Sequence, residues 1–180
     1  MLRAARRSLE WILEWITIIL MIALSVVVII AVCFRLVGES LSWYDEVAAI
    51  QLSWVTYYGA ALAALKRSHI GFDSVLLAIP MPARMVAVAL AETTVIGFFA
   101  IMTWAGMEVL NVLEGSYLIS LTWVPIQLTQ SVIPIGGALF ILCELISLPY
   151  YWRMTAAGTS LEHAEIEEEV KHELKQAGGR

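Results

Sequence analysis

The chain alternates between long apolar stretches and short polar connections. Apolar residues dominate four stretches, at about residues 13–34, 44–66, 84–109 and 126–151. A helix needs roughly 20 predominantly apolar residues to cross the ~30 Å hydrocarbon core of a bilayer, and each stretch is long enough. Residues 26–30 are all Val or Ile and would favour a strand in water. In lipid, however, one segment must satisfy its own backbone hydrogen bonds as a helix. The pattern therefore predicts an all-α integral membrane protein with four transmembrane helices.

The second apolar stretch has the clearest predicted ends. Ser42 and Asp45 have the spacing of a capping box, and Asp45 with Glu46 puts negative charge at the positive end of a helix dipole. At the other end, Lys66 and Arg67 supply the positive charge that suits a helix C-terminus. We expect this helix to cover about residues 44–66.

The second and third connections contain residues that end helices. Pro80 and Pro82 discourage helix continuation before the third stretch, and the apolar residues between positions 70 and 79 suit an interfacial helix. The third helix is expected to end at Asn111, Glu114 and Gly115.

The fourth helix has two open starting points. Either it begins in the mid-120s and is kinked at Pro134, or it starts cleanly near Pro134. Its predicted end is the aromatic group of Tyr150, Tyr151 and Trp152, because aromatic side chains gather at membrane interfaces.

Composition supports the membrane assignment and divides the chain into three regions. The 180 residues are 60% hydrophobic and 15% charged, whereas a soluble domain is about 45–50% apolar and about 25% charged. Residues 1–10 form a basic N-terminus, residues 11–152 the membrane domain and residues 153–180 an acidic tail with six Glu residues. With its four Lys and Arg residues, that tail contributes −2 to the formal charge of −5. The lack of a clustered basic patch argues against a nucleic-acid partner.

The distribution of Lys and Arg predicts the orientation in the membrane. The first connection holds only Arg35 and the third holds none, while the other polar segments together hold ten. These ten are Arg3, Arg6, Arg7, Lys66, Arg67, Arg84, Arg153, Lys171, Lys175 and Arg180. The positive-inside rule then places both termini, the second connection and the acidic tail in the cytoplasm.

Three carboxylic acids lie inside the predicted spans: Glu14, Glu92 and Glu144. At 1.5 Å per residue, Glu92 and Glu144 fall roughly 12–14 Å inside the cytoplasmic ends of their helices, with Glu14 at a similar depth. Intramembrane carboxylates are energetically costly and are therefore functional candidates. They could form an ion or proton relay, or pair between helices or with a partner subunit. We favour pairing, and we predict that Glu92 and Glu144 lie close together.

Several apolar residues are candidates for packing or partner contacts. Trp43 suits an interfacial anchor, whereas Trp54 lies too deep for one and is expected to pack on protein. Gly59 opens a flank of small residues that would permit close helix approach. The other members of this flank are Ala60, Ala63 and Ala64.

Polar candidates lie at both ends of the second helix. Asp45 and Glu46 are expected to cap the helix on the periplasmic side, where they could also dock a partner. Arg35 is close enough in sequence to pair with them across the first connection. His69 is expected to fix the second connection through hydrogen bonds rather than to carry protons, with Asp73 as its candidate partner and as a helix N-cap.

The sequence predicts no catalytic, cofactor or metal residues. Cys33 and Cys143 lie in separate apolar runs, which makes a disulfide between them implausible, and no Cys/His cluster has the spacing of metal ligands. A buried, inert role suits both cysteines.

The motifs occur in an order that points to one family. They are Arg35, Trp43 before Asp45 and Glu46, Trp54 before residues 59–61, the exit from Lys66 to Asp73, the turn Pro80-x-Pro82-x-Arg84, and residues 133–137. Together they resemble the small membrane subunit of tripartite ATP-independent periplasmic (TRAP) transporters, the DctQ-like family. The resemblance covers about residues 10–152 and departs from the usual pattern at Asp45, where Glu is expected more often.

This resemblance implies a partnership rather than an independent activity. The small subunit pairs with, or is fused to, a large multi-helix permease subunit, and a periplasmic solute-binding protein delivers an organic acid for ion-driven import, usually with sodium. In this family the substrate and sodium sites belong to the large subunit, so the chain is expected to be no enzyme and to hold no cofactor. Bound phospholipid is expected at the subunit seam. The expected location is the inner membrane of a bacterium or archaeon.

Two other function classes can be weighed against this one. A small four-helix proton-coupled exporter, acting without a large subunit, would use an acid in its first helix, and Glu14 is such an acid. The acidic tail and the strong Lys/Arg bias argue against this alternative. A haem-binding anchor of a redox enzyme needs two membrane-facing histidines, whereas His69, His163 and His172 all lie outside the predicted spans.

Overall fold

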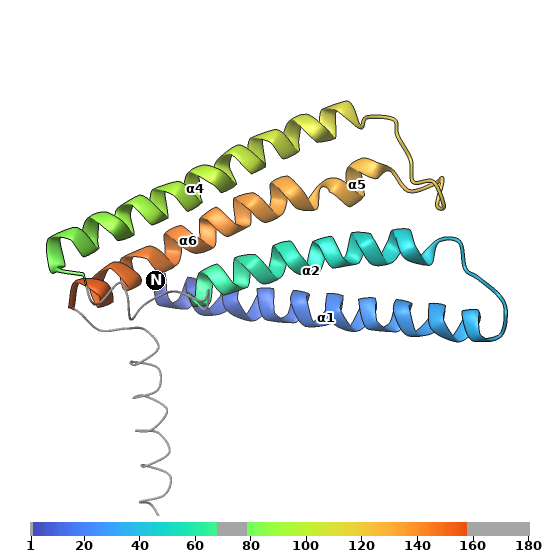
Figure 1. Cartoon of the computed structure of the whole chain (residues 1–180), viewed down its shortest axis with the longest axis horizontal. Coiled ribbons are helices and arrows are strands. Elements are labelled where there is room, and N and C mark those ends of the chain that lie inside the picture. Colours follow the sequence, from blue (N-terminus) through green and yellow to red (C-terminus); the bar gives the residue numbers. More distant parts are fainter. Residues whose placement is uncertain (1, 68–78, 158–180) are drawn as a thin grey trace, which may run out of the picture.

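A computed structural model describes residues 2–67 and 79–157 of the chain. Five helices form in this part: α1 (Leu2–Leu36), α2 (Tyr44–Lys66), α4 (Met81–Val112), α5 (Ile126–Gln130) and α6 (Val132–Ala157). Four segments are long and apolar enough to cross a membrane, with α5 and α6 sharing the fourth. The predicted all-α architecture with four spans is therefore confirmed (Figure 1).

The helices extend beyond three of the four predicted spans. α2 has the expected bounds, but α1 begins at Leu2, α4 begins at Met81, and α6 continues past the aromatic group to Ala157. The sequence reveals the part of each helix that suits hydrocarbon. The helical backbone continues past that part, and in α6 it does so even though Pro149 lies inside the helix.

The predicted capping box at the start of α2 is wrong. Trp43 is the N-cap, in a right-handed helical conformation, and no side chain caps the helix. Ser42 therefore lies one position too early to accept from the first free N–H groups. At the other end, Arg67 adopts a left-handed conformation (φ 56°), and its N–H bonds to the carbonyl oxygens of Ala63 and Ala64.

The fourth span is interrupted before Pro134 rather than at it. α5 ends at Gln130, Ser131 separates the two helices, and α6 starts at Val132. Pro134 thus lies in the first turn of α6, where a missing N–H costs little because that turn has few intrahelical partners. The predicted start in the mid-120s agrees with the start of α5, and the predicted start near Pro134 agrees with the start of α6.

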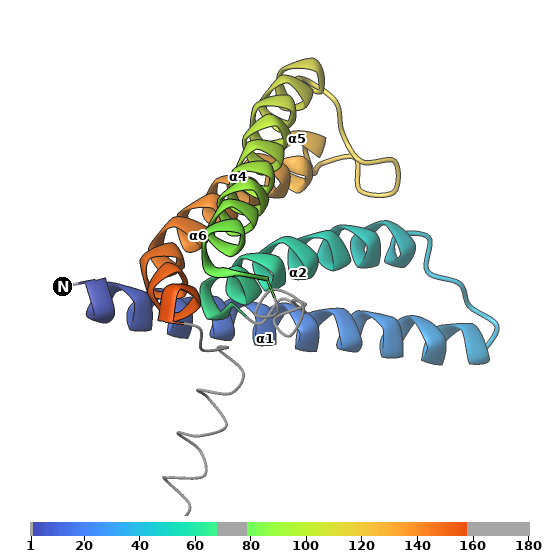
Figure 2. The ribbon, with the colours of Figure 1, turned by 60° about the vertical axis from the view of Figure 1, so that its left-hand side comes forward.

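The helices lie in the spatial order α1, α2, α6, α4 (Figure 1). α1 packs on α2, α2 packs on α6, and α6 packs on α4. Figure 2 shows that α1 and α2 run side by side while α4 and α6 are inclined to them. α2 and α6 are therefore the two central helices of the row.

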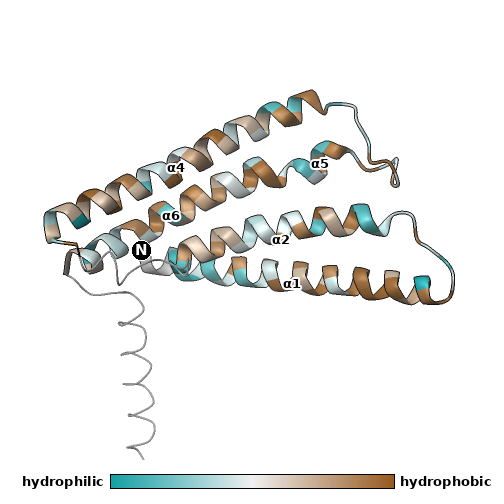
Figure 3. Cartoon of the chain, viewed as in Figure 1, coloured by the Kyte–Doolittle hydropathy of each residue, from teal (hydrophilic) through white to brown (hydrophobic). Residues whose placement is uncertain are grey.

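The most buried residues gather where the C-terminal half of α2 meets α1 and α6. This core consists of Leu13, Ala61, Ala64, Leu65, Phe140 and Cys143. Phe99 of α4 extends it by stacking on Phe140 with ring centroids 3.7 Å apart. Most large apolar side chains on the charge-free part of α1 are exposed, as expected of a surface that faces lipid or a partner subunit. Figure 3, coloured by hydropathy, shows that hydrophobic residues dominate this part of the helix.

Close helix contacts use glycines of α4 and α6. A Cβ at Gly136 would lie 2.6 Å from Tyr57 Cβ of α2, and one at Gly106 would lie 2.9 Å from Ile133 Cγ2. Gly59 has open space around it and makes no close helix contact within the described part of the chain, so its contact with a partner subunit stays a prediction. Ala64, another member of the small-residue flank, is fully buried. The difference arises because Ala61, Ala64 and Leu65 share one helical face, and Gly59 lies off that face.

Candidate functional site

The charged residues of the membrane region converge on the C-terminal end of α2. This helix is shorter than its neighbours, with 23 residues against 35 in α1 and 26 in α6. Its last residues consequently end beside the interior of the other helices rather than beside their ends (Figure 1). Lys66 and Arg67, which are consecutive, point to different partners from this recessed position.

Lys66 ties α2 to α1. Its ammonium group pairs with the carboxylate of Glu14 and lies 3.5 Å from that of Glu10. The side chains of all three residues are about one-third exposed. Glu14 marks the start of the charge-free run of α1, which is roughly 30 Å long at 1.5 Å per residue. Lys66 therefore lies at one edge of the hydrocarbon expected around α1.

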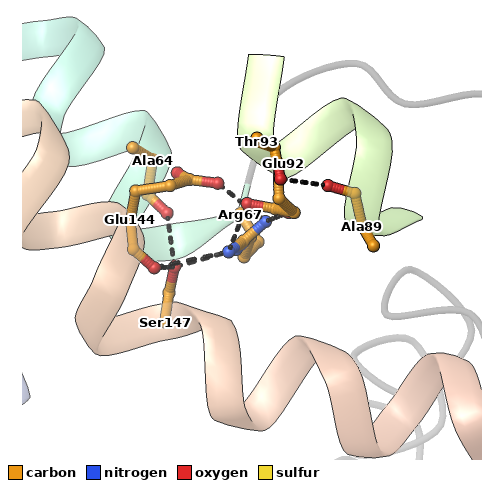
Figure 4. Close-up of polar contacts among 7 residues, drawn as sticks. All are labelled: Ala64, Arg67, Ala89, Glu92, Thr93, Glu144 and Ser147. Carbon is orange, nitrogen blue, oxygen red and sulfur yellow. Dashed lines mark hydrogen bonds and ion pairs between the residues drawn. The ribbon is translucent and has the colours of Figure 1, made fainter. Parts of the chain in front are cut away.

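Arg67 ties α2 to both α4 and α6. Its Nη1 pairs with Glu92 of α4 and lies 2.9 Å from Glu144 Oε1 of α6. Its Nε donates to Ser147 Oγ at 2.8 Å (Figure 4). The side chains of Arg67, Glu92 and Glu144 are only 10%, 11% and 6% exposed. We refer to these four residues as the Arg67 cluster.

Further contacts satisfy the carbonyl groups at the end of α2. Ser147 Oγ lies 3.2 Å from the Ala64 oxygen, and Arg6 Nη2 donates to the Leu65 oxygen at 3.2 Å. Carbonyls in the last turn of a helix lack their regular intrahelical partners, so side chains from α6 and α1 add hydrogen bonds here to the capping bond from the Arg67 N–H. The Arg67 guanidinium also lies over the Tyr151 ring, 4.5 Å from its centroid. The end of α2 is therefore bonded to both neighbouring helices.

A second polar contact lies at the opposite end of α2. The Glu46 carboxylate accepts from the backbone N–H groups of Ile119 and Ser120, at 3.2 and 2.9 Å, and from the Ser120 hydroxyl. The segment that it holds is a tight turn, closed by hydrogen bonds from Leu118 N to Val124 O and from Ile126 N to Ser116 O. Glu46 thus fastens the third connection to the start of α2.

The structure brings some of the predicted site residues together. Glu92 and Glu144 lie close to each other, as predicted, and Arg67 binds both. Trp54 packs on protein as predicted, with its Nε1 donating to the Thr129 oxygen of α5 at 3.1 Å.

Other predicted residues lie elsewhere or outside the described part. Arg35 is close enough in sequence to pair with Asp45 or Glu46, but no ion pair joins them within residues 2–67, and Arg35 and Asp45 are exposed. Trp43 is half-buried at the helix start. His69 and Asp73 lie outside the described residues, so their roles stay predictions.

Sequence reasoning missed the central role of Arg67. It assigned this residue to the helix end, and nothing in the local pattern places that end at the depth of Glu92 and Glu144. The available signal was the presence of two carboxylic acids at a similar depth in the membrane, because buried carboxylates are costly without a cation beside them. Ser147, three residues after Glu144, gave no signal of its own.

Among the residues that the structure describes, the site brings together neither a set of metal ligands nor a pair of thiols. Within the described ranges, no group of three His, Cys, Asp or Glu residues could hold a metal ion. Cys33 and Cys143 are both free. What the geometry provides is a set of ion pairs between helices.

Comparison with known proteins identifies the family. The family model described as "Tripartite ATP-independent periplasmic transporters, DctQ component" matches residues 24–153, which is more than half of the chain. No curated protein matches. The matched range includes Arg67, Glu92, Glu144 and Glu46. The chain therefore belongs to the DctQ family, the small membrane component of tripartite ATP-independent periplasmic transporters.

Proposed function

We propose that the chain is a non-catalytic brace for the large permease subunit of its transporter. The observation that carries this proposal is the Arg67 cluster, in which one buried guanidinium holds three helices together. Lys66 adds the fourth helix from the adjacent position. A bracing subunit must be rigid. A buried polar network whose groups are all hydrogen-bonded is rigid, because each member restricts the positions of the others.

The pairing of the intramembrane acids supports a brace over a proton or ion relay. Glu14 is bound by Lys66, and Glu92 and Glu144 are bound by Arg67. A relay needs carboxylates that release and rebind their charge partners along a path. Here the three acids belong to two ion-paired groups that already link the helices, which favours a structural role.

The remaining assignments follow from family membership and are part of the proposal. The brace would act with a large permease subunit and a periplasmic solute-binding protein in the import of an organic acid, with sodium ions bound by the large subunit. We place the chain in the inner membrane of a bacterium or archaeon, with both termini in the cytoplasm. Phospholipid is expected at the seam with the large subunit.

Co-purification and reconstitution test this proposal directly. The tagged chain is expressed with and without its large subunit, extracted in mild detergent, and reconstituted into vesicles with the solute-binding protein present. We expect uptake only from vesicles that contain both subunits, and stable co-purification of the two. A homogeneous particle of this chain alone that transports a solute or exports protons would overturn the proposal.

A further inference from the structure

The Arg67 cluster contains an imbalance of charge. One guanidinium faces two carboxyl groups, and all three side chains are about nine-tenths buried. If both carboxyls were ionised, the cluster would carry one uncompensated negative charge. An uncompensated charge in a site of low dielectric is strongly unfavourable, because water no longer solvates it.

Within residues 2–67 and 79–157, the groups around the cluster do not supply the missing positive charge. Lys66 faces Glu10 and Glu14, and the Arg6 guanidinium bonds to a backbone oxygen and lies 5.5 Å from the Tyr150 ring centroid. Within the described part of the chain, the ion pairs of Glu92 and Glu144 all go to Arg67. The other groups that line the cluster, Ser147, Tyr151 and the Cys143 thiol, are ordinarily neutral.

The two carboxyl groups also share one guanidinium nitrogen. Arg67 Nη1 pairs with Glu92 of α4 and lies 2.9 Å from Glu144 Oε1 of α6, which holds the two acids close together. Two acids that share one site repel each other when both are ionised, and such pairs commonly hold a single proton between them.

We propose that Glu92 and Glu144 form a proton-binding site that holds one proton per folded chain at neutral pH. The proton resides on one carboxyl oxygen and is donated to an oxygen of the other carboxyl. Arg67 then neutralises the single remaining negative charge. This site gives the brace a titratable contact between α4 and α6, which goes beyond a passive structural role.

Infrared spectroscopy of the full chain in lipid nanodiscs can count this proton. The carboxylic acid C=O stretch is measured at neutral pH, with its shift in D₂O as identification. We expect one buried protonated carboxyl in the wild-type chain and none in E92Q or E144Q, because in each variant the remaining carboxylate pairs with Arg67. The matched control is E14Q, which removes an acid paired with Lys66 and should leave the band unchanged.

Several outcomes would overturn the proposal. It fails if the wild-type chain shows no buried protonated carboxyl, or if the band persists in both E92Q and E144Q. Should a glutamine variant not fold, E92D or E144D replaces it, since each keeps a carboxyl and moves it by one methylene. Each aspartate variant is expected to shift the frequency of the band, and an unshifted band in both would also contradict the assignment.

Discussion

Arg67 combines an unusual backbone conformation with an unusual environment. Its φ of 56° is in the left-handed region, which is unfavourable by about 1–2 kcal/mol for residues other than glycine. The conformation turns the chain out of α2 while its N–H still bonds to the Ala63 and Ala64 oxygens. The ion pairs of the side chain with Glu92 and Glu144 offset the backbone strain.

Replacing Arg67 with glutamine should destabilise the bundle strongly. The variant R67Q leaves two buried carboxyls without their cation, and breaking a buried ion pair in this way costs about 3–5 kcal/mol. Thermal unfolding of the detergent-solubilised chain, followed by circular dichroism, is the measurement. R153Q is the control, because Arg153 is exposed. Equal unfolding temperatures for R67Q and R153Q would show that the cluster contributes little.

Glu46 controls a local feature rather than the whole bundle. In E46A the N–H groups of Ile119 and Ser120 lose their acceptor, so their hydrogen exchange should speed up at least several-fold. Hydrogen–deuterium exchange with mass spectrometry on peptides covering residues 116–125 checks this. D45N is the matched control, since the neighbouring Asp45 is exposed and is not bonded to the turn. Similar exchange in the two variants would contradict the assigned role.

At the scale of the elements, α6 is placed by glycines that allow close approach. Gly136 faces α2, while Gly137 lies against Thr103 of α4. In lipid, helix association depends on close van der Waals packing, because lipid tails are as apolar as the side chains. The position of α6 between α2 and α4 therefore depends on the absence of a Cβ at these residues.

An alanine at Gly136 should push α6 away from α2. Its Cβ would lie 2.6 Å from Tyr57 Cβ, which cannot rotate away, and overpacking of this kind costs about 1–3 kcal/mol. G59A is the matched control, because a Cβ there meets no atom within 4 Å and alanine is the better helix former. We expect a lower unfolding temperature for G136A and an unchanged or higher one for G59A. The reverse order would contradict the packing described.

At the scale of the whole molecule, the charged residues at the two ends of the α1–α2 pair are separated by about one membrane thickness. Glu14 and Lys66 meet at one end, and Arg35 and Asp45 lie near the other. The intervening 20 residues of α1 correspond to roughly 30 Å, the thickness of a hydrocarbon core. The first connection and the N-terminus therefore lie on opposite sides of the membrane.

Cysteine labelling in whole cells can test which side is which. In a C33A background, with Cys143 buried, S42C should react with a membrane-impermeant maleimide added outside the inner membrane. R7C and R153C should react only after the cells are opened, because the positive-inside rule places them in the cytoplasm. Labelling of R7C in intact cells, with S42C protected, would reverse the proposed orientation.

The sequence by itself determined the number and type of the spans, the bounds of α2 and the family, and it placed Glu92 and Glu144 at a similar predicted depth. Long apolar runs dictate membrane helices because no other single segment satisfies its backbone in lipid. Their similar depth led to the prediction that these two acids lie close together. These properties depend on the composition of single segments, which can be read directly from the sequence.

Only the tertiary structure decided which residues meet across helices. It showed that Glu46 binds the third connection instead of Arg35, that Gly136 rather than Gly59 lies at a tight contact, and that Arg67 reaches Glu92 and Glu144. Arg67 and Ser147 are 80 positions apart in sequence. Their contact depends on how deep α2 ends relative to α4 and α6, and that depth is set by packing between helices rather than by any helix alone.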